Sequence, residues 1–69
     1  MFDKNKFKGI VVAKGKDMKE IAKSLGVHET TLYRKLNDNG NFSREEIESL
    51  IVFLHIENPM EIFFADTLA

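Results

Sequence analysis

The sequence predicts a small all-α domain of five short helices, and three observations lead to this fold class. Apolar residues recur with helical spacing in every segment, and no stretch alternates apolar and polar residues long enough to predict a strand. Capping and turn residues separate these segments at short intervals. A chain of 69 residues is expected to form one small domain, spanning 1–69, because it is too short for two.

The first predicted helix covers residues 4–14 and ends at Gly15. The second covers residues 18–25, begins after an N-cap at Asp17 and ends at Gly26. Each has one apolar stripe that can face a core: Phe7, Ile10 and Val11 in the first, and Met18, Ile21, Ala22 and Leu25 in the second.

Three further helices are predicted after the second. The third covers residues 29–36 and is followed by a turn cluster of Asn, Asp and Gly. Ser43 and Glu46 form a capping box that begins the fourth, whose apolar stripe runs to Leu54. A short closing helix over 59–64 is expected after an N-cap at Asn58.

Basic and acidic residues divide between the two halves of the chain. Residues 1–37 hold nine of the ten Lys and Arg residues and four acids, a net charge of +5. Residues 38–69 hold Arg44 and seven acids, a net charge of −6. The whole-chain charge of −1 hides this asymmetry, which predicts a nucleic acid or another acidic partner for the first half.

Several classes of protein are excluded by composition. The chain has no Cys, so it has no disulfide framework and no zinc-thiolate site. The longest apolar run, 50–54, is far shorter than the ~18 residues that span a bilayer, and residues 1–14 lack a signal-peptide pattern. A soluble, cytoplasmic protein without membrane contact is therefore expected. Neither His28 nor His55 has metal-ligand partners at suitable spacing, so no metal site is expected. No hydroxyl side chain has a neighbouring base that could activate it, so catalysis is not expected either. No cofactor and no small-molecule ligand are expected.

Residues 18–37 have the spacing of a helix-turn-helix, because only three residues separate the second and third helices. Ala22 is small enough to allow the two helices to approach closely, and Gly26 tolerates the positive φ that such a turn requires. Apolar side chains at Val27, Leu32 and Leu36 can fill the angle between the helices. An ordinary helical hairpin would satisfy the same pattern.

The third helix carries the candidate base-reading residues on its outward face. In helix-turn-helix proteins the N-terminal part of this helix enters the major groove. Arg34 can donate two hydrogen bonds to guanine, Thr30 can contact a thymine methyl group and Glu29 can accept from cytosine N4, although Glu29 also suits the helix dipole. The predicted set is His28, Glu29, Thr30, Tyr33 and Arg34.

Polar and basic residues around this helix are the candidate phosphate contacts. They precede or follow the helices of the motif, or lie on them, and can neutralise or hydrogen-bond backbone phosphates. The predicted set is Lys14, Lys16, Lys19, Thr31, Lys35, Asn39, Asn41 and Arg44. For any single lysine a solvated helix face is an equally simple interpretation.

The run MKEIAKSLGVHETTLYRKLN, residues 18–37, resembles the helix-turn-helix of the Cro and lambda-repressor-like family, particularly small phage-type repressors. The resemblance covers nearly the whole chain, including the closing segment IENPMEIFF. It implies a compact five-helix DNA-binding domain with the second and third helices as the motif, in which Glu29, Thr30, Tyr33 and Arg34 read bases. Family members usually have Gln where this chain has Met18, so Lys16 or Lys19 is expected to hold that phosphate.

The acidic half ends in more apolar residues than one short helix can bury. Because helix-turn-helix domains bind paired half-sites as two-fold dimers, these residues predict a dimer interface. The interpretation that they merely cap the core or lie on the surface is as simple. The predicted interface residues are Met60, Ile62, Phe64 and Leu68.

The sequence therefore predicts a DNA-binding transcriptional regulator rather than an enzyme. It is expected to be a repressor of the phage or Cro type that binds a roughly palindromic double-stranded operator as a homodimer. The alternative is a helical protein-interaction module, antirepressor-like or antitoxin-like, whose basic face binds an acidic protein. Retention of genomic DNA fragments would distinguish the two.

Overall fold

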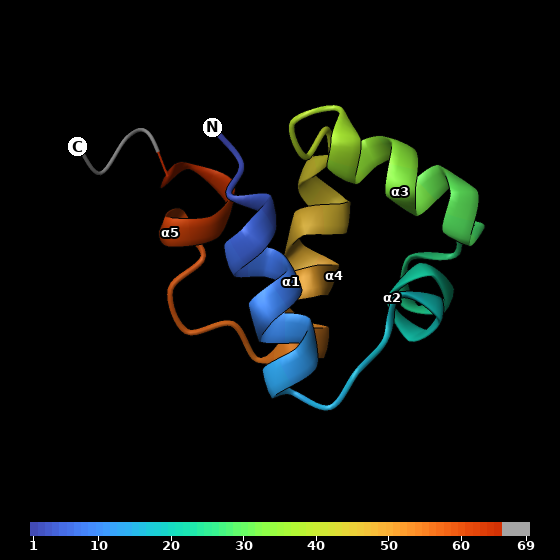
Figure 1. The fold of residues 1–69 in the computed structure, drawn as a ribbon, viewed down its shortest axis with the longest axis horizontal. Coiled ribbons are helices and arrows are strands. Elements are labelled where there is room, and N and C mark those ends of the chain that lie inside the picture. Colours follow the sequence, from blue (N-terminus) through green and yellow to red (C-terminus); the bar gives the residue numbers. More distant parts are fainter. Residues whose placement is uncertain (66–69) are drawn as a thin grey trace.

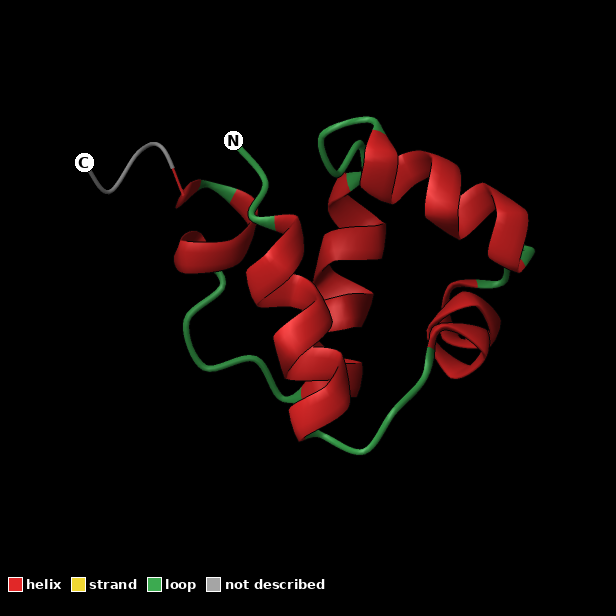
Figure 2. Ribbon diagram, in the orientation of Figure 1, coloured by secondary structure: helices red, strands yellow, loops and turns green. Residues whose placement is uncertain are grey.

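The computed structural model describes residues 1–65, and helices account for most of this range. Within it there are five helices and no strand (Figures 1 and 2). The all-helical prediction is thus confirmed for the described residues. Their bounds are α1 Lys4–Ala13, α2 Met18–Leu25, α3 Glu29–Asn37, α4 Arg44–Leu54 and α5 Met60–Phe63.

Side-chain caps define where three of these helices begin. The carboxylate of Asp17 accepts a hydrogen bond from the N–H of Glu20 at 2.8 Å, as predicted. Asp3 caps α1 in the same way through the N–H of Lys6, at 2.9 Å. Both hydrogen bonds of the predicted Ser43 capping box are present at the start of α4.

The predicted N-cap at Asn58 is wrong, because no side chain caps α5. Pro59 already has helical backbone angles, so the first turn closes on backbone carbonyls instead. The N–H of Glu61 donates to the carbonyl of Asn58 at 3.3 Å, and the N–H of Phe63 donates to that of Pro59 at 2.9 Å. This closing helix is therefore only four residues long and depends on packing rather than on a cap.

The core lies where α2 packs against α3 and α4, and where α1 packs against α5. Most predicted inward-facing residues are buried there, while Ile10, Met18, Leu25 and Val27 lie partly buried at its edge. Burial of this apolar surface is the main stabilising contribution in so small a fold. The fully buried side chains are Phe7, Ile21, Leu32, Leu36, Leu50, Leu54 and Ile62.

Four aromatic rings form a cluster at the end of the core where the chain begins. Phe2 contacts all of the other three, with ring centroids 5.6 Å from Phe7, 5.9 Å from Phe42 and 5.8 Å from Phe63. These separations are typical of favourable aromatic pairs. Neither Phe2 nor Phe42 belongs to a helix, and the apolar periodicity predicted neither as a core residue.

Backbone hydrogen bonds attach the first three residues to the closing helix and to the loop after α3. The N–H of Asp3 donates to the carbonyl of Ile62 at 2.7 Å, and the N–H of Ala65 donates to that of Met1 at 2.9 Å. The N–H of Phe2 reaches the side-chain oxygen of Asn39 at 3.4 Å. Figure 1 shows the N-terminal end beside α5. Among the described residues, no helix has both the length and the hydropathy needed to cross a bilayer.

Candidate nucleic-acid interface

The turn between α2 and α3 is built from Gly26, Val27 and His28. Gly26 has a left-handed backbone with φ of 71°, which is the conformation expected at this helix end. The N–H of Val27 then donates to the carbonyl of Ala22 at 3.0 Å, which closes the last turn of α2. His28 is extended and offers no side-chain cap to α3. The two helices thus meet through the short turn that the sequence predicts.

The buried and exposed faces of α3 are clearly separated. Leu32 and Leu36 face the core and are almost completely buried. Solvent covers the remaining surface of the helix, where Tyr33 retains 45% of its accessible surface. The structure places the whole predicted base-reading set on exposed positions: His28, Glu29, Thr30, Tyr33 and Arg34. In Figure 1 this helix forms one edge of the molecule, with α2 below it.

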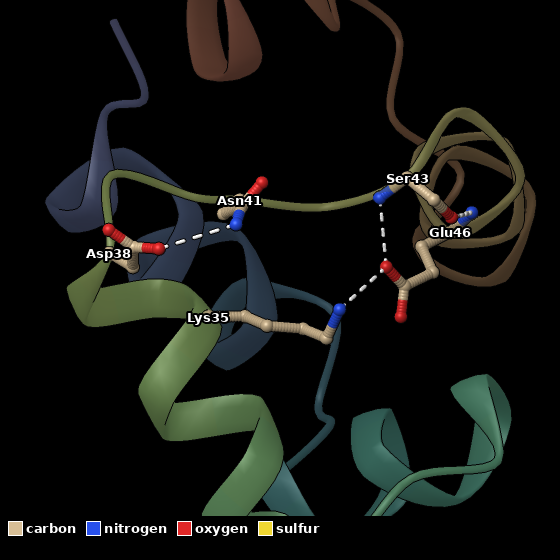
Figure 3. Close-up of polar contacts among 5 residues, drawn as sticks. All are labelled: Lys35, Asp38, Asn41, Ser43 and Glu46. Carbon is tan, nitrogen blue, oxygen red and sulfur yellow. Dashed lines mark hydrogen bonds and ion pairs between the residues drawn. The ribbon is translucent and has the colours of Figure 1, made fainter.

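Lys35, a predicted phosphate contact, has an acidic partner within the protein. Its ammonium lies 3.0 Å from a carboxylate oxygen of Glu46, with the two side chains only 25% and 17% exposed (Figure 3). Burial raises the pKa of Glu46, but the hydrogen bond from the Ser43 N–H and the charge of Lys35 outweigh it and hold that pKa below its ordinary value. Lys35 therefore ties α3 to α4, and part of its side chain stays exposed.

The two predicted asparagine contacts stabilise the loop after α3. The side-chain amide of Asn41 donates to the carboxylate of Asp38 at 3.3 Å (Figure 3). Asn39 accepts from the backbone of Phe2, and its φ of 57° places it in the left-handed region that Asn tolerates. Both residues are exposed, but their side chains already have partners within the protein. Thr31 is partly buried, and Arg44 pairs at the surface with Glu48 at 3.2 Å.

The predicted lysine contacts do not lie on one surface. Lys14 lines a hollow with His55, Glu57 and Glu61, which belongs to the acidic end of the chain. Lys16 and Lys19 instead line a groove that Glu29 and Tyr33 of α3 also border. The ammonium of Lys16 lies 5.1 Å from the ring centroid of Phe53, a cation–π geometry. The structure therefore brings Lys16 and Lys19 to the face of α3 and separates Lys14 from it.

One lysine that borders this groove was missed at the level of sequence. Lys8 lies on α1, one turn before the exposed Val12, and both line the groove beside Tyr33. Helical spacing would have shown that Lys8 lies off the Phe7 and Val11 stripe. It could not have shown that this side of α1 faces α3, because that depends on how the helices pack.

The predicted dimer interface is only partly exposed. Met60 and Phe64 retain 41% and 43% of their accessible surface. Ile62 is 1% exposed, so its prediction as an interface residue is wrong: its side chain points into the core between α1 and α5. The fourth predicted residue, Leu68, lies outside the described residues.

The described part of the chain holds no group of three or more His, Cys, Asp or Glu side chains that could bind a metal ion. Comparison with models of protein families, with curated proteins and with solved structures gives no match to this chain. Its geometry and charge are therefore the basis for a functional assignment.

Proposed function

We propose that this protein is a sequence-specific double-stranded-DNA-binding transcriptional regulator, a repressor of the phage or Cro type. The observation that carries the proposal is the pair α2 and α3, joined by the turn 26–28 with its left-handed Gly26. This turn leaves the outward face of α3 exposed next to a groove bordered by lysines. An exposed helix of this kind matches the width of the major groove.

The chemistry of the exposed face supports base reading. Arg34 lies on the outward side of α3 and makes no ion pair or hydrogen bond through its side chain among residues 1–65. A free guanidinium can donate both of its parallel hydrogen bonds to guanine O6 and N7. Glu29, on the first turn of the same helix, disfavours bases that present only acceptors. The exposed surface of α3 therefore carries one group that attracts guanine, Arg34, and one that rejects unsuitable bases, Glu29.

The charge distribution supports a defined orientation on DNA. Nine of the ten basic residues precede the loop after α3, whereas seven acids follow Asn37. A duplex is a dense row of phosphates, so it attracts the first set and repels the second. This polarity favours docking through α2 and α3, with α4 and α5 turned away.

We further propose that two copies bind one operator through a contact around Met60 and Phe64. These two side chains are the large apolar residues exposed at α5, and the acidic end of the chain keeps them clear of DNA. A two-fold contact there would place two α3 helices on half-sites about one turn of DNA apart.

A titration against mixed genomic fragments at moderate salt tests the proposed function. Retention of fragments, with affinity that falls steeply as salt rises, is expected of a DNA-binding protein. Retention of no fragment at this salt concentration would contradict the proposal and favour the alternative, a module that binds an acidic protein through the same basic face.

A further inference from the structure

A groove runs beside α3 and collects basic side chains from three parts of the chain. Lys8 comes from α1, Lys16 from the connection that follows it, and Lys19 from α2. Exposed Val12 and half-buried Met18 supply its apolar surface. Tyr33 and Glu29 form the wall that belongs to α3.

Two of these lysines are available to a ligand. The side chains of Lys8 and Lys19 are exposed and make no ion pair or hydrogen bond with any residue in 1–65. Lys16 differs, because its ammonium lies against the ring of Phe53. Lys8 and Lys19 are therefore the lysines of the groove whose ammonium groups no side chain in 1–65 holds in place.

The acids of the groove do not cancel the charge of its lysines. Two acids, Asp17 and Glu29, line the groove against three lysines, so its lining keeps a net positive charge. Glu29 stands on the first turn of α3, on the wall that would face base edges if α3 entered the major groove. The wall formed by α1 and α2 is therefore the positive one.

The position of the groove relative to α3 indicates what it would bind. The major groove is about 12 Å wide and a helix with its side chains is about 10 to 12 Å across, so the sugar–phosphate strands run directly beside an inserted helix. The groove lies on that flank of α3, next to Tyr33. Ammonium groups above an apolar surface are complementary to phosphates joined by deoxyribose.

We propose that this groove is a phosphodiester-binding site that seats one DNA strand bordering the major groove. Lys8 and Lys19 each neutralise one phosphate, and Val12 with Met18 packs beneath the sugar. This inference rests on the proposed DNA binding. It also explains how the chain can hold a DNA strand although Met18, which cannot bind a phosphate, stands at the start of α2. It also predicts that Lys14, near α5, takes no part.

The test measures the dissociation constant for a mixed-sequence duplex of about 20 base pairs as a function of salt, in the full chain and four variants. Lys8→Ala and Lys19→Ala should each lower the slope of log affinity against log salt by about 0.9 per protomer. At 0.1 M salt each should weaken binding roughly fivefold to tenfold for each protomer bound. Lys8→Arg, which keeps the charge, should restore the slope.

Lys14→Ala is the matched control, because Lys14 is an exposed lysine at the end of α1 that lines the hollow beside α5 instead of this groove. Its slope should equal that of the unmodified protein, and circular dichroism should show equal helix content in all variants. Unchanged slopes for Lys8→Ala and Lys19→Ala, or an equally lowered slope for Lys14→Ala, would refute phosphate binding by the groove. Either result would leave the proposed DNA binding intact. Absence of salt-dependent binding by the unmodified protein would instead refute the proposed function.

Discussion

The ammonium of Lys35 lies 3.0 Å from the carboxylate of Glu46, and this pair joins the last turn of α3 to the first turn of α4. The same carboxylate oxygen accepts the N–H of Ser43 at 2.8 Å, so one atom both caps α4 and fixes its angle to α3 (Figure 3). Because both contacts favour the ionised acid, the pKa of Glu46 is lowered despite partial burial.

Replacing Glu46 by Gln should lower the free energy of unfolding by about 1 kcal/mol at pH 7, through loss of the ionic part of the capping box and of the contact to Lys35. Because the pKa of Glu46 is lower in the folded state than its ordinary value of 4.5, the ionised carboxylate stabilises the fold fully at pH values above 4.5. This contribution is lost as the pH falls through the folded-state pKa. The difference between the two proteins should therefore shrink below pH 4.5. Urea unfolding at several pH values measures it.

Glu48→Gln is the control for this prediction, because Glu48 lies on the same helix and pairs with Arg44 at the exposed surface. Exposed pairs contribute little, so a change below about 0.5 kcal/mol is expected. An equal effect of the two substitutions, or an effect of Glu46→Gln that persists unchanged in acid, would contradict the role assigned to Glu46.

Gly40→Ala should be one of the most destabilising single-methyl changes in the chain. An added Cβ would overlap the side chain of Phe2, and the φ of 66° is itself unfavourable for Ala. A loss of about 2 to 4 kcal/mol is expected, because Phe2 cannot move without breaking the aromatic cluster. Gly15→Ala has a similar φ of 69° but open space around it, so its loss in thermal or urea unfolding should be only about 1 kcal/mol.

His55→Gly should stabilise the protein by about 0.5 to 1 kcal/mol. His55 ends α4 with a φ of 51°, a left-handed conformation in which Gly is unstrained. Asn39 has a comparable φ of 57°, but Asn tolerates it and its side chain accepts a hydrogen bond from Phe2. Asn39→Gly should therefore give no gain, and a gain as large as that of His55→Gly would contradict this explanation.

The helices were predictable from the sequence because their signals are local. Asp17, Gly26 and Ser43 act within one turn of themselves, and the structure places the corresponding helix ends within one or two residues of the prediction. Packing between distant segments was not predictable in the same way. Phe2 and Phe42 lie outside any periodic segment, so only the folded chain shows that they belong to the core.

The candidate site was predicted unevenly for a related reason. Exposure of Arg34 follows from its position on a helix whose buried stripe is clear. The partners of Lys35 and Lys14 depend on which helix packs opposite each of them. The order of the helices along the chain does not predict that packing. Ile62 was misassigned because it is one of three consecutive apolar residues, and periodicity over four helical residues cannot show which of them faces inward.

Phe64→Asp should weaken the proposed dimer at least tenfold, because a carboxylate would be buried in an apolar contact. Sedimentation over a range of concentrations, with and without operator-length duplex, measures the change. Val52→Asp is the control, since Val52 is an exposed apolar residue on α4 outside the proposed contact. Monomers at every concentration, both free and on DNA, would refute dimerisation.

Base reading by α3 is tested most directly by selecting bound duplexes from random DNA with the unmodified protein and with Arg34→Ala. The unmodified protein should enrich a roughly two-fold symmetric site. Arg34→Ala should lose discrimination at one base pair of each half-site, at a cost of about 1 to 3 kcal/mol, and keep its preference elsewhere. No enriched site for the unmodified protein, or an identical site and affinity for Arg34→Ala, would contradict the claim.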